Sequence, residues 1–364
     1  MSVHYLSPGP SRLPAPVREQ IAAELLDTFG IGVSVMEISH RSPQYTELSE
    51  DTLARATALL GVPDTHALLL TPFGAQQHFS LLIHHLSAVG DVISYAETGV
   101  WSGLAVRDAR ASGRKLDLIY SGAPNFQHLG DPDRYPVNAN SRFVHLTINN
   151  TVYGTEYPQI PRHFSAPLVL DMTSSLAARC DIPWDKVGMI YASAQKNFGI
   201  AGVSIVIMRK DLLEQSIRFT SASHLGDALS YLRIHEKRSA LNTPPVFPIF
   251  AANRFFRWME SVGGVPEMER RSLAKAKAVY TAIDGSFYRP LAAPEHRSRH
   301  NIVFTLPSEA LCETFIKEAA AQGILEIKGY RGVGGIRASF YNGVDVSSAT
   351  YFADFLKAFR DRHG

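Results

Sequence analysis

Short apolar runs alternate with longer amphipathic stretches along the first two thirds of the chain. Polar or glycine residues bound the short runs, which is typical of buried strands, while the longer stretches carry apolar residues at helical spacing. The predicted strands are 67–70, 91–95, 116–120, 142–147, 167–170, 188–192 and 203–208, and the predicted helices are 14–26, 53–60, 77–86 and 101–110. Repeated strand and helix of this kind predict an α/β fold with a largely parallel sheet that is covered on both faces.

The pattern changes after Pro244-Pro245. Two long helices are predicted first, and strands then alternate with helices, which is an α+β arrangement. The predicted helices are 247–262, 265–283, 308–321 and one from about 347, and the predicted strands are 301–304, 325–328 and 336–341. A chain of 364 residues is long enough for two domains, because single cores stop growing near about 250–300 residues. We therefore place a domain boundary near Gly263-Gly264.

The bulk composition narrows the class of protein. Hydrophobic residues make up 45% of the chain and charged residues 19%, which is ordinary for a globular enzyme. The formal net charge of +2 gives no reason to expect a nucleic-acid partner, and no apolar run is long enough to predict a membrane span. The two cysteines lie far apart, and the N-terminus lacks a signal-peptide pattern, so we expect a cytoplasmic protein.

Two polar side chains follow predicted strands at positions suited to chemistry. Asp171 ends the apolar run 167–170, and Lys196 follows the run 188–192, about 25 residues later. Ligands of open α/β sheets bind outside the strand ends, although a lone lysine in a turn is more often a surface residue. The pair suits pyridoxal phosphate, whose aldehyde forms a Schiff base with a lysine and whose ring nitrogen pairs with a carboxylate. Burial or nearby cations must lower the pKa of the amine, which is ordinarily near 10.4.

The residues around this pair resemble a known family. The segment Ala192-Ser-Ala-Gln195-Lys196-Asn197 is similar to the cofactor-lysine segment of phosphoserine aminotransferases, a branch of the class V, fold-type-I pyridoxal-phosphate enzymes. The similarity continues in the same order through 7–10, 32–42, 241–245 and 334–342. It implies a large domain (15–262) built on a mostly parallel seven-stranded sheet, and a smaller α+β domain formed by 1–14 and 263–364. It also implies pyridoxal 5′-phosphate as cofactor and a homodimer with shared active sites.

The resemblance implies a role for each matching residue around the cofactor. Lys196, Asp171 and Trp101 are the expected catalytic residues, with Trp101 stacked on the pyridine ring. Gly74, Ala75 and Gln76 join a strand to a helix, whose N-terminal N–H groups suit a phosphate. The expected cofactor-binding residues are Ala75, Gln76, Trp101, Thr151, Asp171, Gln195, Lys196, Asn242 and Thr243, the last two from the neighbouring subunit.

Four further residues are expected to bind substrate. Arg337 matches the arginine that grips the α-carboxylate, for which a planar guanidinium is suited. His40 and Arg41, contributed across the dimer, and Arg331 match positions that hold the phosphate of phosphoserine or the side-chain carboxylate of glutamate. The chain departs from the family at three places: Gln76 replaces an arginine of many bacterial members, Tyr330 replaces a common histidine, and Asn150 replaces a common glutamate.

The leading hypothesis is a transaminase in which Lys196 is the general base. The expected reaction converts phosphoserine and 2-oxoglutarate to 3-phosphohydroxypyruvate and glutamate in serine biosynthesis, with 4-phosphohydroxythreonine of pyridoxine synthesis as a second substrate.

Two alternatives stay open. A paralogue could act on a different, non-phosphorylated amino acid or as a lyase, as Gln76 and Tyr330 suggest. A non-catalytic homologue is the other alternative, against which the joint presence of Lys196, Asp171, Trp101 and Arg337 speaks. No metal site is expected, because His84 and His85 are adjacent in a predicted helix and face different ways.

Overall fold

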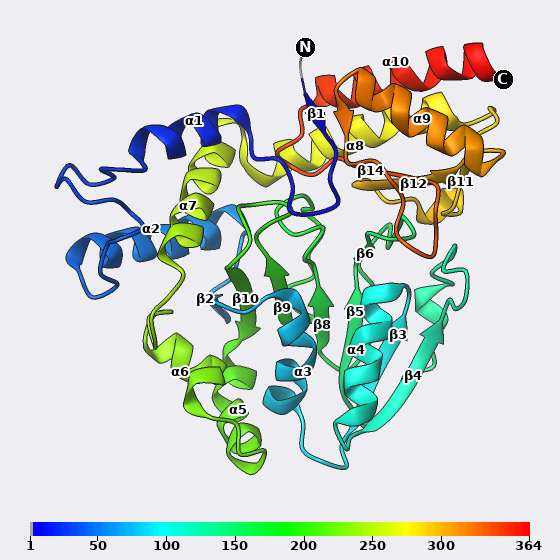
Figure 1. Ribbon diagram of the computed structural model, residues 1–364. Helices are drawn as coiled ribbons and strands as arrows, with labels where there is room; N and C mark the ends of the chain where they lie inside the picture. The colour runs from blue at the N-terminus through cyan, green and yellow to red at the C-terminus, as the bar shows by residue number, and fades with distance from the viewer. Residues whose placement is uncertain (1–2) are drawn as a thin grey trace.

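The computed structural model describes residues 3–364, and its centre is a seven-stranded sheet (Figure 1). The strands lie in the order β2 (His66–Thr71), β10 (Ser204–Arg209), β9 (Val187–Ser193), β8 (Leu168–Asp171), β5 (Ser141–Thr147), β3 (Val92–Glu97) and β4 (Lys115–Ser121). Neighbours from β9 to β4 pair in parallel, while β10 is antiparallel to both β9 and β2. The prediction of a largely parallel sheet is confirmed.

Helices cover both faces of this sheet. One face packs against α3 (Ala75–Leu86), α4 (Val100–Ala111), α5 (Lys210–Ala222) and α6 (Tyr231–Glu236), and the other against α1 (Ala15–Glu24), α2 (Pro43–Leu59) and α7 (Val246–Ser261). Successive residues of a strand point to opposite faces of the sheet. Leu69 packs in the core on the side of α3, and Leu70 packs in the core on the side of α7. Burial on both faces explains why these strands are continuous apolar runs.

The C-terminal third forms a smaller layer with its own core (Figure 1). Its three-stranded sheet, in the order β11 (Arg289–Pro290), β12 (Asn301–Thr305) and β14 (Ile336–Ser339), packs with α8 (Gly264–Ile283), α9 (Glu309–Ala321) and α10 (Val346–His363). Strand β1 (His4–Tyr5) pairs in parallel with β13 (Ile324–Leu325). We propose the domain division at Gly263-Gly264, between α7 and α8, and propose that the N-terminal residues belong to the smaller domain.

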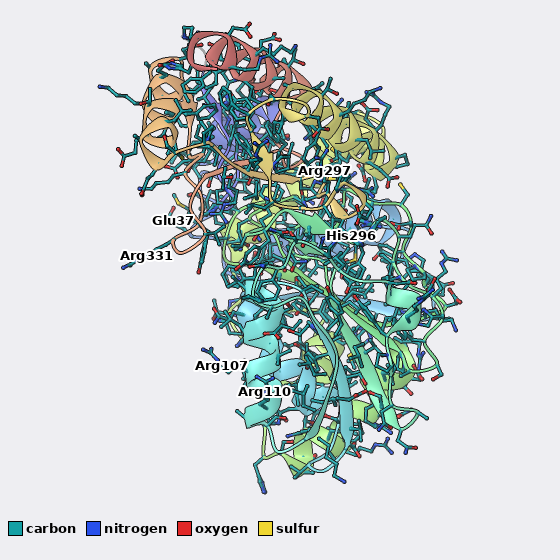
Figure 2. The ribbon with its side chains drawn as sticks, turned by 90° about the vertical axis from the view of Figure 1, so that its right-hand side faces the viewer. Glu37, Arg107, Arg110, His296, Arg297 and Arg331 are labelled. Atoms are coloured by element: carbon teal, nitrogen blue, oxygen red, sulfur yellow. The ribbon has the colours of Figure 1, made fainter. Side chains whose placement is uncertain are left out.

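The remaining elements are short. A two-stranded ribbon joins β6 (Asn149–Asn150) to β7 (Thr155–Glu156), and three 3-10 segments are η1 (Pro132–Arg134), η2 (Asp227–Leu229) and η3 (Pro294–His296). Figure 2 shows Arg331 on a loop that projects from the C-terminal layer, and His296 where this layer approaches the large sheet. Among residues 3–364, no helix is sufficiently long and apolar to cross a membrane.

Several details differ from the predictions. The helix predicted at 53–60 begins ten residues earlier, at Pro43, where the Ser42 side chain caps its first turn by accepting from the Tyr45 N–H. The strand predicted at 336–341 ends at Ser339. The strand predicted at 325–328 ends at Leu325, because Glu326 has a left-handed backbone (φ 63°) that cannot continue a strand. The two strands that flank Lys196 are antiparallel to each other, although the core was expected to be parallel at this point. Lys196 therefore lies beyond the carboxyl end of β9 and ahead of the amino end of β10.

Candidate active site

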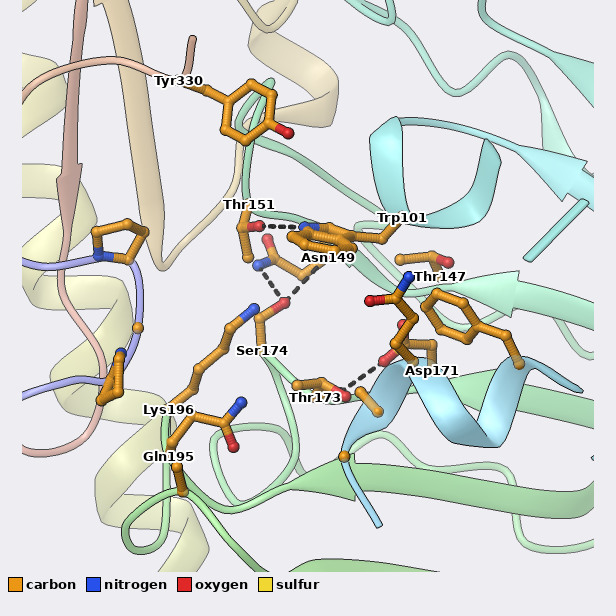
Figure 3. Close-up of a pocket in the computed structure, with 18 of the residues that line it drawn as sticks. Trp101, Thr147, Asn149, Thr151, Asp171, Thr173, Ser174, Gln195, Lys196 and Tyr330 are labelled. Carbon is orange, nitrogen blue, oxygen red and sulfur yellow. Dashed lines mark hydrogen bonds between the residues drawn. The ribbon is translucent and has the colours of Figure 1, made fainter. Parts of the chain in front are cut away.

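A cavity of about 540 Å³ opens at the carboxyl edge of the parallel strands (Figure 3). The register pairs Thr147 of β5 with Asp171 of β8, and Asp171 with Tyr191 of β9, so these strands end nearly level with one another. Side chains that are remote in sequence meet here for that reason. The predicted residues that line the cavity are Ala75, Gln76, Trp101, Thr151, Asp171, Gln195, Lys196 and Arg337.

Lys196 lies in the turn that follows β9, and its side chain extends into the cavity (Figure 3). Gly9 packs against it so closely that a Cβ atom at Gly9 would lie 3.4 Å from the lysine side chain. The pKa of Lys196 is lowered to about 8, chiefly by burial; the Asp171 carboxylate opposes this decrease and the Arg337 guanidinium adds to it. The amine therefore loses its proton far more readily than an exposed lysine.

Asp171 faces the same cavity from the end of β8 (Figure 3). It is 5% exposed, and one carboxylate oxygen accepts a hydrogen bond from the backbone N–H of Thr173 at 3.0 Å. Burial raises the pKa of this carboxyl, while the Thr173 hydrogen bonds and the charge of Lys196 oppose the increase. A buried carboxylate of this kind favours a cationic or N–H partner in the cavity.

Trp101 forms one side of the cavity from the first turn of α4. Its indole Nε1 donates a hydrogen bond to the Thr151 hydroxyl at 3.0 Å, which fixes the plane of the indole (Figure 3). The fixed indole offers a flat apolar surface on which a planar ring can stack.

The N-terminus of α3 faces the cavity from another direction. Gly74 is the N-cap, and Ala75 begins the helix, without a side-chain cap. The first backbone N–H groups of a helix favour an anion through their unpaired donors and the helix dipole. Gln195 also lines the cavity, and its backbone carbonyl accepts from the N–H of Ser11 at 2.8 Å.

Arg337 enters the cavity from β14 of the smaller layer. One Nη donates to the Thr151 carbonyl at 3.3 Å, and the guanidinium carbon lies 5.7 Å from the centre of the Tyr330 ring. The Nε–H is buried and has no hydrogen-bond partner among residues 3–364. Burial lowers the pKa of Arg337, but a guanidinium stays charged at neutral pH. The Arg337 guanidinium is therefore a fixed cation in the cavity with an unpaired N–H donor, which suits binding of a carboxylate.

A buried hydrogen-bond network connects the floor of the cavity to the smaller layer. The Asn149 amide donates to the Ser174 hydroxyl at 2.8 Å and to the Asn301 side-chain oxygen at 2.7 Å. The Asn301 amide donates to the Ser339 hydroxyl at 2.9 Å and to the Tyr341 hydroxyl at 3.0 Å. This network links β6, β12 and β14, and the last of these carries Arg337.

The network also reaches the segment that covers Lys196. The Tyr341 hydroxyl donates to the Pro8 carbonyl at 3.1 Å, and Gly9 follows directly in contact with the lysine. The same network thus holds both the cavity floor and the N-terminal segment.

Five predicted residues lie outside this cavity. His40 and Arg41 precede α2, and Asn242 and Thr243 precede α7, with all but the half-buried His40 exposed. Arg331 is exposed in the loop 329–335, which lines an adjacent cavity of about 500 Å³.

Sequence reasoning did not assign several residues that line the cavity. These are Pro8, Gly9, Pro10, Thr147, Asn149, Thr173 and Ser174. Four of these residues lie at or just after the ends of the apolar runs 142–147 and 167–170, and this pattern could have indicated them: Thr147, Asn149, Thr173 and Ser174.

Comparison with known proteins agrees with this geometry. The family model for class-V aminotransferases matches residues 3–350. The chain belongs to the class-V aminotransferase family.

Members of this family match the chain over nearly its whole length. A phosphoserine aminotransferase of Geobacillus kaustophilus is 40% identical over 359 residues, which is 97% of each chain. One of Desulfatibacillum aliphaticivorans is 38% identical over 365 residues, covering 100% of this chain and 99% of its own.

Solved structures of the same enzyme are similar in fold. Phosphoserine aminotransferase from Bacillus circulans subsp. alkalophilus has a TM-score of 0.94 at 34% identity, covering 100% of this chain and 99% of its own. The pyridoxal-phosphate-bound enzyme from Trichomonas vaginalis has a TM-score of 0.92 at 31% identity, covering 98% of this chain and 100% of its own. These likenesses agree with the expected fold: a mostly parallel seven-stranded sheet with a smaller C-terminal sheet.

Proposed function

We propose that this chain is a pyridoxal-phosphate-dependent aminotransferase whose cofactor binds in the cavity of Lys196 and Asp171. The observation that carries the proposal is the placement of an amine with a pKa of about 8 and a buried carboxylate at the ends of adjacent strands. The cofactor is the one bound in the Trichomonas vaginalis relative.

The cavity residues fit this cofactor. The buried Thr147 hydroxyl and the Arg337 Nε–H lack hydrogen-bond partners among residues 3–364, so the cavity has polar groups to spare for a ligand. We propose that Lys196 and Asp171 hold the aldehyde and ring-nitrogen ends and that Trp101 and Thr151 flank the ring. The N-terminus of α3 at Ala75 and Gln76, together with Gln195, would hold the phosphate.

The proposed chemistry assigns one task to each side chain. Bound pyridoxal phosphate supplies an electron sink for the negative charge that develops at the substrate Cα. Asp171 keeps the ring nitrogen protonated, and Arg337 fixes the substrate carboxylate. Lys196 then moves the Cα proton as general base, for which a pKa near the working pH is effective.

We propose phosphoserine and 2-oxoglutarate as the substrates, giving 3-phosphohydroxypyruvate and glutamate in serine biosynthesis. Support comes from relatives named phosphoserine aminotransferase, which are 37–40% identical to this chain over nearly its whole length. We propose 4-phosphohydroxythreonine as a second substrate. A cytoplasmic location stays a prediction from the sequence.

We also propose a homodimer in which each active site is completed by the partner subunit. His40, Arg41, Asn242 and Thr243 lie outside the cavity of their own chain, so a substrate or cofactor phosphate in that cavity can meet them only across an interface. The segment that precedes His40 and Arg41 in the sequence exposes three large apolar side chains, which suit an interface: Leu26 (73%), Ile31 (49%) and Met36 (60%).

One observation favours a second candidate, an aminotransferase for a non-phosphorylated substrate. Lys196 and Arg337 are the cationic side chains that line the cavity of one chain, and neither Gln76 nor Tyr330 adds a charge. Glutamate-dependent amination of 3-phosphohydroxypyruvate should be compared with that of hydroxypyruvate. The proposed function predicts a higher kcat/KM for the phosphorylated acid, and a preference for hydroxypyruvate would overturn the proposed substrate.

A further inference from the structure

A second group of chemically suited side chains lies outside the cavity. His128 belongs to the long loop after β4, while Glu295 and His296 belong to η3 in the smaller layer. One ligand atom from each residue lies within 4.8 Å of the other two. Two imidazoles and a carboxylate form a donor set that binds first-row transition metals such as Zn²⁺.

The distances around Glu295 are close to those of a metal site. Its carboxylate Oε1 lies 3.4 Å from His128 Nδ1 and 3.9 Å from His296 Nδ1. Ligand atoms at roughly 2.1 Å from a tetrahedral ion are roughly 3.4 Å apart. The longer separations must shorten on binding, and the side chain of His128, 58% exposed, has room to rotate.

His296 offers an unused nitrogen to this cluster. Its buried Nδ1 has no hydrogen-bond partner among residues 3–364 and lies 3.9 Å from the Glu295 carboxylate. A buried lone pair without a partner is otherwise a cost to folding.

The backbone brings the two segments together without help from these side chains. The N–H of Ala293 donates to the Gln127 carbonyl at 3.0 Å, which places the residues directly before η3 beside the residue before His128. An isolated bridge between Thr155 and Arg297 anchors the other end of η3. The ligands are thus already close together before an ion binds, which lowers the entropic cost of binding.

We propose that His128, Glu295 and His296 bind one divalent transition-metal ion of the Zn²⁺ class, with water completing the coordination. The nitrogen donors disfavour Ca²⁺ and Mg²⁺, which prefer oxygen ligands. The ion would cross-link the loop after β4 to η3, which leads through Ser298 to Asn301 of the buried network. It would therefore stabilise the junction between the two layers, and this inference does not depend on the proposed reaction.

Calorimetric titration of the chelator-treated, dialysed full-length holoenzyme with ZnCl₂ tests the proposal. We expect one saturable site per chain, a higher melting temperature with Zn²⁺, and at least tenfold weaker binding in both His128→Ala and Glu295→Gln. Both substituted residues are exposed, so these variants are expected to fold.

Two control variants make the test specific. His163→Ala removes another histidine that forms an ion pair, with Asp133 at 3.0 Å, and Cys180→Ser removes an exposed thiol. Both should bind Zn²⁺ as the wild type does. Unchanged affinity in His128→Ala, loss of the site in Cys180→Ser, or no saturable binding at millimolar ZnCl₂ would each overturn the proposal and leave the three residues as an ion-paired surface cluster.

Discussion

Replacing Asn301 should lower the free energy of unfolding and make the N-terminal segment that covers Lys196 more mobile. Asn301 is fully buried and accepts one hydrogen bond from Asn149 while donating to Ser339 and Tyr341. Asn301→Ala deletes all three hydrogen bonds at once. The change therefore separates the cavity floor from the smaller layer and from the N-terminal segment.

The expected loss follows from what each partner retains. Asn149 keeps its bond to Ser174, and Tyr341 keeps its bond to the Pro8 carbonyl, whereas the buried Ser339 hydroxyl loses its side-chain partner. Each lost hydrogen bond contributes a net of about 1 kcal/mol, and a buried group left without a partner costs more, so Asn301→Ala should lower the free energy of unfolding by at least about 3 kcal/mol. Ser339→Ala removes one of the three and should cost about 1 kcal/mol.

Denaturant unfolding of both variants measures the difference in stability, and hydrogen exchange of residues 6–12 reports on the N-terminal segment. We expect faster exchange and a lower kcat in Asn301→Ala, with little change of either in Ser339→Ala. The network argument would be refuted if Asn301→Ala unfolded within about 0.5 kcal/mol of the wild type, the usual range for a surface substitution.

Three further predictions concern single charges. Burial lowers the pKa of Lys275 to about 7. Above pH 7 the unfolded chain therefore binds more protons than the folded chain, and the contribution of Lys275 to the free energy of unfolding should rise by about 2 kcal/mol from pH 7 to 9. The stability difference between the wild type and Lys275→Met should grow by that amount, and a constant difference would contradict the assignment. Asp171→Asn should lower kcat roughly 10- to 100-fold, since a charged hydrogen bond contributes about 1.5–3 kcal/mol; retained kcat with tight cofactor binding would exclude the proposed role. Arg337→Lys should raise KM for the amino acid more than it lowers kcat, because lysine cannot bind a carboxylate in a fork; an unchanged KM would mean that the carboxylate binds elsewhere.

The sheet could be predicted from sequence because its strands are buried on both faces. A strand such as β9 is buried throughout and carries no polar residue before Ser193 at its end, so its run stands out between polar turns. The reversed direction of β10 was also accessible in principle. Ten residues separate Ser193 from Ser204, whereas a parallel crossover needs about a dozen or more.

The candidate site could be predicted only in part. Asp171 ends a strand and Lys196 follows one, so a local pattern indicates both. The pairing of Asn149 with Asn301 joins residues 152 positions apart, and no local pattern encodes such a contact. The contact of Gly9 with Lys196 is equally non-local, because it depends on how the N-terminal segment crosses the cavity.

Borohydride reduction of the purified protein, followed by peptide mapping, tests the central claim most directly. The account predicts that pyridoxal phosphate becomes covalently fixed to the peptide that contains Lys196, and that Lys196→Ala abolishes the labelling while leaving the fold intact. Labelling of a different lysine, or a protein that takes up no cofactor, would contradict it.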